Sequence, residues 1–127
     1  MQIAKYVRLY ADAEGESHFE DVETELAPVD FAPPAAPLNI APISTASQCL
    51  WVGAPVGWRG DIPHPAPNRQ IFCTMAGSYE IAVSDGTIRS FDVGSVLLLE
   101  DTWGKGHSTR ITSDADALIV AVTLADA

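Results

Sequence analysis

Apolar residues recur along the chain in short runs that alternate with polar positions, a pattern typical of β-strands rather than helices. The runs are rich in Val, Ile, Thr and aromatic residues and are separated by Gly, Pro and Asp-Gly. Residues 20–26 alternate acidic and apolar positions, which fits either a strand with one face in water or a short exposed segment. We therefore expect a nearly all-β protein with strands over residues 2–10, 20–26, 48–56, 69–77, 78–83, 87–91, 96–99 and 117–124.

The clearest local signal is the Asp85-Gly86 pair between the alternating segments 78–83 and 87–91. A tight primed turn requires positive φ angles, which Asp and Gly tolerate. The pair therefore predicts a β-hairpin at this point of the chain.

Residues 27–42 contain five prolines, which remove backbone donors and fix φ. Neither a helix nor a central strand can run through this stretch, so it predicts an extended arm. The arm either wraps its own barrel or crosses to a second copy, and Phe31, Leu38 and Ile40 are the side chains that it could bury. Because the arm is apolar and the chain is acidic, the pattern favours a homodimer.

Residues 94–110 join an apolar strand to a cluster of polar groups. The strand at 96–99 is followed by two carboxylates and a Gly-rich loop, which together supply Glu100, Asp101, Trp103, Lys105 and His107. Binding groups usually lie on loops held by a rigid scaffold, so this order predicts the mouth of a pocket. A further irregular stretch is expected over residues 57–68.

The size and charge of the chain restrict its partners. At 127 residues it is long enough for one domain with its own core. Its formal net charge of -10, from 17 acidic and 7 basic residues, argues against nucleic acid and anionic membranes as partners. A small molecule is the expected ligand, and because no phosphate-cradling loop occurs we expect no nucleotide cofactor.

The N-terminus lacks the pattern of a secretory signal, and no apolar run approaches the roughly 18 to 20 residues of a membrane helix. We therefore expect a cytoplasmic protein with no membrane partner. Cys49 and Cys73 could pair, but two cysteines without an export signal are more often reduced thiols.

Two short motifs resemble those of the cupins, which are small jelly-roll barrels. The first cupin motif has two histidines one residue apart, then Glu or Gln, then Gly, and these places hold His64, Ala66, Gln70 and Gly77. The second opens with Gly, reaches Pro six positions later and adds a histidine, and these places hold Gly94, Glu100 and, two residues late, His107. The segment GSVLLLEDTWGKGH is also similar to the second motif of a subgroup of single-domain bacterial cupins with a Glu-Asp-Thr-x-Gly-x-Gly-His signature.

The resemblance spans residues 47–124 and implies a single-domain cupin jelly-roll barrel that encloses a pocket and forms a homodimer. Residues 47–127 would then form the barrel core. Residues 1–46 would supply N-terminal strands and the Pro-rich arm, packed on the barrel or on a partner subunit.

Cupins typically hold a divalent metal through three histidines and one carboxylate. By this resemblance the chain offers His64, Gln70 and His107, while Ala66 leaves one place vacant. Two imidazoles suit Zn, Fe, Ni or Mn, but a neutral amide is a weaker ligand than a carboxylate. The alternative is a metal-free barrel in which both histidines hydrogen-bond a ligand or the backbone.

His107 follows Gly104 and Gly106, which let the loop bring an imidazole close to a bound molecule. A histidine that faces Glu100 or Asp101 can serve as a proton shuttle, so these three residues are the candidate catalytic groups.

Four more side chains are candidates for binding the substrate: Trp58, Arg69, Trp103 and Lys105. Arg69 and Gln70 are neighbours on an expected strand, so they point to opposite sides. If Gln70 faces the pocket, Arg69 pairs with an acidic neighbour outside. His18 lies outside the motifs and is expected at the surface.

Three functions follow from this pattern. The first is an enzyme of cupin type, such as a lyase, isomerase or cyclase acting on a small metabolite, with or without a metal. The second is a non-catalytic barrel that binds or senses a ligand. The third is a structural dimer whose former metal site has decayed.

Overall fold

The computed structural model describes residues 1–126, which form twelve β-strands and no helix. The strands are β1 (Ile3–Ala11), β2 (Ser17–Glu25), β3 (Ala27–Val29), β4 (Leu38–Ile40), β5 (Ala46–Ala54), β6 (Arg59–His64), β7 (Gln70–Ala76), β8 (Tyr79–Val83), β9 (Ile88–Phe91), β10 (Val96–Leu99), β11 (His107–Ile111) and β12 (Ala117–Leu124). The prediction of an all-β protein is confirmed.

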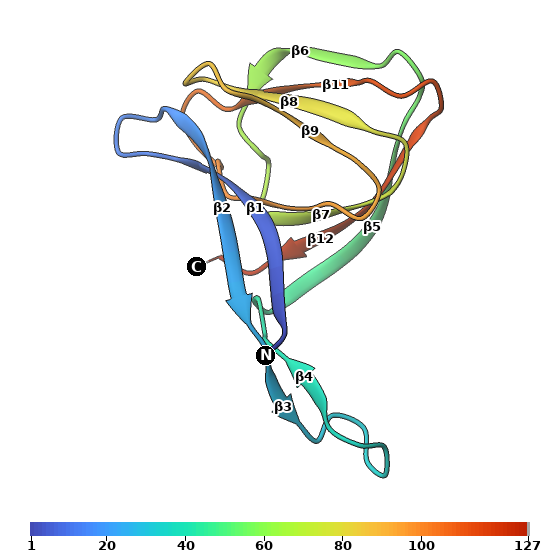
Figure 1. Cartoon of the computed structure of the whole chain (residues 1–127). Coiled ribbons are helices and arrows are strands. Elements are labelled where there is room, and N and C mark those ends of the chain that lie inside the picture. Colours follow the sequence, from blue (N-terminus) through green and yellow to red (C-terminus); the bar gives the residue numbers. More distant parts are fainter. Residues whose placement is uncertain (127) are drawn as a thin grey trace.

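Ten of these strands form two sheets that face each other (Figure 1). The larger sheet has the order β2-β1-β10-β7-β12-β5, and the smaller has the order β6-β11-β8-β9. Neighbouring strands are antiparallel except for β1 and β10, which run parallel. The arrangement is that of a jelly-roll barrel, as the sequence predicted.

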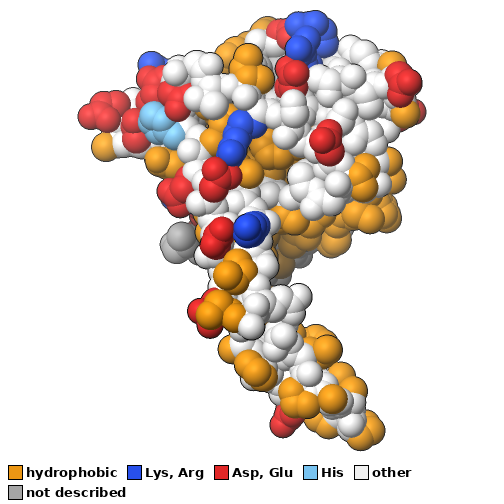
Figure 2. All heavy atoms as spheres, viewed as in Figure 1, with side chains coloured by type: hydrophobic (Ala, Val, Ile, Leu, Met, Phe, Trp, Pro, Cys, Tyr) orange, Lys and Arg blue, Asp and Glu red, His pale blue; other side chains and the backbone are white. Residues whose placement is uncertain are grey.

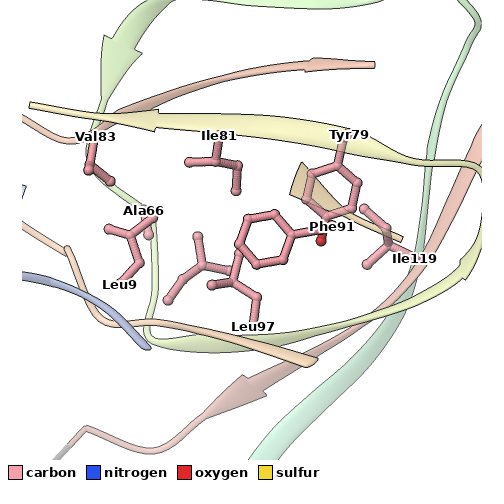
Figure 3. Packing of buried hydrophobic residues seen from close by; sticks show 9 residues of the cluster. Leu9, Ala66, Tyr79, Ile81, Val83, Phe91, Leu97 and Ile119 are labelled. Carbon is pink, nitrogen blue, oxygen red and sulfur yellow. The ribbon is translucent and has the colours of Figure 1, made fainter. Parts of the chain in front are cut away.

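The main hydrophobic core lies between the two sheets (Figure 3). Tyr79 and Phe91 stack there with ring centroids 5.4 Å apart. Leu97 and Leu99 point into this core, while Leu98 between them packs on the opposite side of the sheet. Strand β10 is therefore buried on both faces, which explains why its sequence is continuously apolar instead of alternating.

The predicted hairpin at Asp85-Gly86 is confirmed as the connection between β8 and β9. Gly86 has a φ of 94°, but among the described residues no residue other than glycine has a positive φ. Asp85 contributes instead through its side chain, whose Oδ1 accepts a hydrogen bond from the backbone N–H of Thr87 at 2.8 Å. Because Asp85 does not have a positive φ, the turn is not of the primed type that we expected. The contact from Asp85 to Thr87 is an Asx-type hydrogen bond that stabilises the turn.

The Pro-rich stretch forms an arm, as predicted. Strands β3 and β4 pair only with each other, and their hairpin stands away from the barrel (Figure 1). No central strand runs through the prolines. Figure 2 shows many hydrophobic side chains on the visible side of the arm, between white backbone and polar atoms.

Two expectations about irregular stretches were wrong. Residues 57–68 contain strand β6, which is an edge strand paired with β11 and therefore tolerates Pro63. The Gly-rich loop after β10 ends earlier than expected, because His107 is already the first residue of β11. Both differences have the same cause, since pairing between β6 and β11 orders two segments that have little strand character of their own.

Candidate functional site

A cavity of about 430 Å³ opens between the two sheets. Its wall is mainly apolar and includes side chains from both sheets, among them Leu50, Val52, Trp58, Ala66, Phe72, Tyr79, Leu99, Ile111 and Ile119. The residues of the wall with polar side-chain groups are His64, Gln70, Tyr79, His107 and Thr109. A concave apolar pocket with a few convergent polar groups is typical of a site for a small molecule.

Of the polar residues in the wall, His107 is the one whose side chain is hydrogen-bonded to a buried carboxylate. Its Nδ1 lies 2.6 Å from Oδ2 of Asp101, which follows β10 directly. Both side chains are buried, and the exposed fraction of Asp101 is 0%. The other carboxylate oxygen, Oδ1, has no hydrogen-bond partner in the described part of the chain. An Nδ1–H donated to Asp101 leaves Nε2 as the ring nitrogen that is free to act on a ligand.

His64 lies beside His107, with ring centroids 5.2 Å apart. The two residues are cross-strand partners, because β6 ends at His64 where β11 begins. Nδ1 of His64 lies 2.8 Å from the carbonyl oxygen of Pro65 and donates to it, since a carbonyl can only accept. Each imidazole thus has Nδ1 engaged outside the cavity, which leaves its Nε2 available.

Two glycines allow this close approach. A Cβ atom on Gly106 would lie 2.1 Å from the carbonyl carbon of His64, and one on Gly104 would lie 2.5 Å from the carbonyl oxygen of Gly15. Buried Ser17 fixes the same loop, because its hydroxyl donates to the carbonyl of Gly106 at 2.6 Å. The Gly-rich loop is therefore an ordered support for His107.

Of the two carboxylates proposed as partners of His107, Glu100 does not face it. Glu100 accepts hydrogen bonds from the guanidinium groups of Arg8 and Arg69. Burial raises the pKa of Glu100, but the hydrogen bonds from the two arginines outweigh burial and keep that pKa below its ordinary value. Glu100 is thus a structural anion that ties β1, β7 and β10 together.

The other candidates for binding are mostly placed away from the cavity. Trp58 and Gln70 line it. Arg69 points outward to Glu100, as expected for the neighbour of an inward Gln70. Lys105 forms an ion pair with Glu16 at 2.8 Å, and exposed Trp103 packs against Gly15. Of the polar candidates from Glu100 to His107, the one that lines the cavity is His107, the first residue of β11.

Sequence reasoning missed Thr109 and Tyr79, both of which line the cavity. The signal for Thr109 was its spacing of two residues from His107, which places both on one face of a strand. Tyr79 accepts a hydrogen bond from the hydroxyl of Thr74 at 3.2 Å, and burial raises its pKa to about 12. Its phenol therefore stays protonated near neutral pH and can only donate or accept a hydrogen bond.

The donor atoms of the cavity do not fit the metal centre that the cupin pattern implies. Within residues 1–126, no group of three or more His, Cys, Asp or Glu side chains is placed to hold a metal ion. His64 and His107 fit two positions, and Gln70 adds only a neutral amide. The remaining histidine position is Ala66, which is buried and apolar. The available side chains suit hydrogen bonding better than coordination.

Comparison with known proteins gives one result that concerns the fold. The cupin domain of Cnp3 from Schizosaccharomyces pombe aligns with 98% of this chain and 84% of its own, with a TM-score of 0.50 at 14% sequence identity. The chain has a cupin fold. Protein NMB1881 from Neisseria meningitidis aligns with 61% of this chain and 72% of its own, with a TM-score of 0.43 at 17% identity.

No protein-family model matches this sequence, and no curated protein matches it. The similarity therefore lies in the arrangement of strands, and the function has to be argued from the cavity. Among the described residues, no helix is long and apolar enough to cross a membrane.

Proposed function

We propose that this cupin binds a small, uncharged and largely apolar organic molecule in the barrel cavity and acts on it as a lyase, isomerase or cyclase. The observation that carries the proposal is the buried pair of Asp101 and His107, of which His107 lines that cavity. A carboxylate that holds Nδ1–H of an imidazole orients the ring and stabilises its protonated form. Nε2 of His107 is then the atom that takes a proton from the bound molecule or returns it.

The character of the cavity wall determines the class of ligand. Among the residues that the structure describes, no Asp, Glu, Lys or Arg lines the cavity. A charged ligand would lose its hydration there without gaining a counter-ion, which is costly in an apolar site. An uncharged molecule with one or two carbonyl or hydroxyl groups fits better, because His64, Gln70 and Thr109 can hydrogen-bond such groups.

The second candidate is a cupin that binds the same class of molecule without changing it. This function is favoured by the partners of His64, whose Nδ1 is held by a backbone carbonyl and not by a carboxylate. Acid–base chemistry commonly uses two poised groups, and of the two histidines that line the described cavity only His107 has a charged partner. Binding alone requires the cavity and its hydrogen-bonding groups.

The test has two steps that separate these candidates. Uncharged cyclic and acyclic ketones, enols and phenols are first screened by thermal shift and by isothermal titration, with their carboxylate analogues as matched controls. Bound compounds are then followed by NMR in D₂O, where proton abstraction at carbon replaces hydrogen with deuterium. Exchange in the wild type that disappears in His107→Gln supports catalysis.

Two results would contradict the proposal. Binding without exchange or turnover would leave the non-catalytic cupin as the function. Preferential binding of the carboxylate analogues would overturn the assigned ligand class. His18→Gln serves as the control variant, because His18 lies at the surface and does not line the cavity.

A further inference from the structure

Two imidazole rings lie side by side in the cavity wall, and together they restrict the ligand more than the apolar residues do. The ring centroids of His64 and His107 are 5.2 Å apart, and both residues line the cavity. In a neutral imidazole one ring nitrogen carries a hydrogen and the other is an acceptor. The partner of each Nδ1 therefore decides what the corresponding Nε2 offers to a ligand.

The partners of both Nδ1 atoms are acceptors. Nδ1 of His64 lies 2.8 Å from the carbonyl oxygen of Pro65, and Nδ1 of His107 lies 2.6 Å from Oδ2 of Asp101. A carbonyl has no hydrogen to donate, and neither has an ionised carboxylate, so the hydrogen of each neutral ring is on Nδ1. Each Nε2 then carries a lone pair and can only accept a hydrogen bond.

The chain supplies no donor to these two acceptors. Within residues 1–126, no side chain and no backbone group donates to Nε2 of His64 or of His107. The buried side-chain atom without a partner in this part of the chain is Oδ1 of Asp101, so Nε2 of His107 is not sealed in the wall. His107 is buried while His64 is exposed, and the pair therefore extends from the rim of the cavity into its interior.

The remaining hydrogen-bonding groups of the wall are less restrictive. Gln70 and Thr109 each carry both a donor and an acceptor, so they can adapt to either kind of group on a ligand. The histidine pair cannot adapt in this way and requires a ligand that brings hydrogens. An ammonium group would bring them, but no carboxylate lines the described part of the cavity to compensate its charge. Hydroxyl groups meet the requirement without a charge.

The apolar wall lies on the other side of the cavity from the pair. His64 and His107 belong to β6 and β11 of the smaller sheet. Leu50, Phe72 and Ile119 line the cavity from β5, β7 and β12 of the larger sheet. Because the cavity lies between the sheets, a ligand can direct its hydroxyls to one sheet and bury its carbon frame against the other.

We infer that the ligand is an uncharged vicinal diol, with two hydroxyls on neighbouring carbons of an apolar frame, and that these hydroxyls donate to Nε2 of His64 and of His107. A hydroxyl lies about 2.8 Å from its acceptor, so neighbouring hydroxyls can reach two rings whose centroids are 5.2 Å apart. A ketone or an ether offers only acceptors and leaves both nitrogens unpaired. The inference rests on the proposed function, since it requires that the cavity bind an uncharged molecule, and it narrows the class of that molecule.

Titration of the full chain with cis-cyclohexanediol that has neighbouring hydroxyls, followed by ligand-observed NMR, tests the inference. The matched compounds are its dimethyl ether, which has no donor, cyclohexanol, which has one, and the isomer with hydroxyls on opposite carbons, which cannot reach both rings. The vicinal diol should bind at least about tenfold more tightly than its ether, because the ether leaves two acceptors without a donor. It should also bind more tightly than the other two alcohols.

His64→Phe keeps an aromatic ring at the rim and removes one acceptor. In this variant the vicinal diol should bind no more tightly than cyclohexanol. His18→Gln is the matched control, because His18 does not line the cavity, and it should keep the full preference for the diol. Circular dichroism checks that both variants are folded.

Long-range ¹⁵N–¹H NMR of the two imidazoles adds a readout that requires no ligand, and it should find the hydrogen of both rings on Nδ1. A hydrogen on Nε2 of either neutral ring would overturn the inference, and so would equal affinities for the diol and its ether. Both results leave the proposed function in place as long as uncharged compounds bind. Tighter binding of a carboxylate analogue, or no binding of any uncharged compound, would overturn the inference and the proposed function together.

Discussion

Asp101 and His107 form a hydrogen bond of 2.6 Å between Oδ2 and Nδ1, and both side chains are buried in the barrel wall. Their neighbours hold them from two sides. The backbone N–H of Ala66 donates to the carbonyl of Asp101 at 2.9 Å, and the loop that leads to His107 is bound by Ser17. The pair therefore keeps one geometry without a ligand, which is the condition for a preorganised acid–base group.

Replacement of Asp101 by Asn separates positioning from binding. The amide keeps the size of the side chain but loses the carboxylate that accepts the Nδ1–H of His107, and its NH₂ group can impose the other tautomer of the ring. We expect nearly unchanged ligand affinity and a turnover reduced about 10²- to 10⁴-fold. Long-range ¹⁵N–¹H NMR of the imidazole reports the tautomer directly.

The control for Asp101→Asn is His64→Gln, which removes a cavity side chain whose Nδ1 is held by a backbone carbonyl and not by a carboxylate. This variant should weaken binding more than turnover. Equal losses of affinity and turnover in Asp101→Asn, with the tautomer of His107 unchanged, would show that Asp101 only supports the wall.

Much of this site was predictable from the sequence, because it depends on local order along the chain. The apolar run of β10, the acidic residues that follow it and the Asp85-Gly86 hairpin are signals within a few residues. The pairing of His64 with His107 was also expected, although only through resemblance to the cupins. These features do not require knowledge of distant contacts.

Which of the two carboxylates, Glu100 or Asp101, is the partner of His107 was not predictable from the local sequence. It depends on Arg8 and Arg69, which are 92 and 31 residues away from Glu100 along the chain. Strand β6 was missed for the same reason, since its order comes from pairing with β11. Contacts between distant segments cannot be predicted from the local pattern of apolar residues.

Gly106→Ala should destabilise the barrel strongly. Its φ of 71° is unfavourable for any residue with a Cβ, and that Cβ would lie 2.1 Å from the carbonyl carbon of His64. Because backbone atoms cannot move aside cheaply, we expect a loss of at least about 3 kcal/mol in the free energy of unfolding. Urea denaturation followed by fluorescence measures this loss.

Gly86→Ala is the matched control for the same conformational strain. Gly86 has a φ of 94°, but a Cβ there meets no atom within 4 Å. Only the strain of the left-handed conformation remains, which costs about 1–2 kcal/mol. If both variants lose the same amount, the close approach of the loop to His64 has no energetic weight.

The surface cluster around His18 predicts a pH dependence of stability. Nε2 and Nδ1 of His18 lie 2.7 and 2.8 Å from carboxylate oxygens of Asp12 and Asp85. The hydrogen bond with Asp12 and then that with Asp85 raise the pKa of His18 above its ordinary value. The stabilisation is therefore complete below the ordinary pKa of 6.5 and is lost as the pH rises through the raised value.

The carboxylates set the lower limit of the pH range in which the cluster around His18 stabilises the fold. The hydrogen bond to His18 lowers the pKa of Asp12, so its contribution is present above its ordinary value of 3.8 and is lost as the pH falls through the lowered value. Denaturation at pH 6 and pH 8 should show a larger loss of stability at pH 8 in the wild type than in His18→Gln. The same loss in both proteins would assign the pH dependence to other groups.

The composition of the cavity wall predicts a weak response to metal removal. His64 and His107 supply two imidazoles, and Ala66, which is 3% exposed, holds the third position with a methyl group. We expect treatment with a chelator to leave the affinity for the uncharged ligand unchanged, as measured by titration before and after treatment. Elemental determination on the purified protein accompanies this measurement, and a ligand affinity that falls on chelation and returns with Zn²⁺ or Mn²⁺ would contradict the prediction.

The substitution Ala66→His should give the cavity a metal-binding activity, and it tests the same argument from the opposite direction. Ala66 lines the cavity, so a histidine at this position would bring a third imidazole toward those of His64 and His107. Three imidazoles bind Co²⁺ and Zn²⁺ much better than two do, and Co²⁺ reports its coordination through visible absorption. The variant should develop this absorption at Co²⁺ concentrations where the wild type does not. Equal Co²⁺ affinity in both proteins would mean that the wild-type cavity already completes a metal centre with donors other than the third histidine.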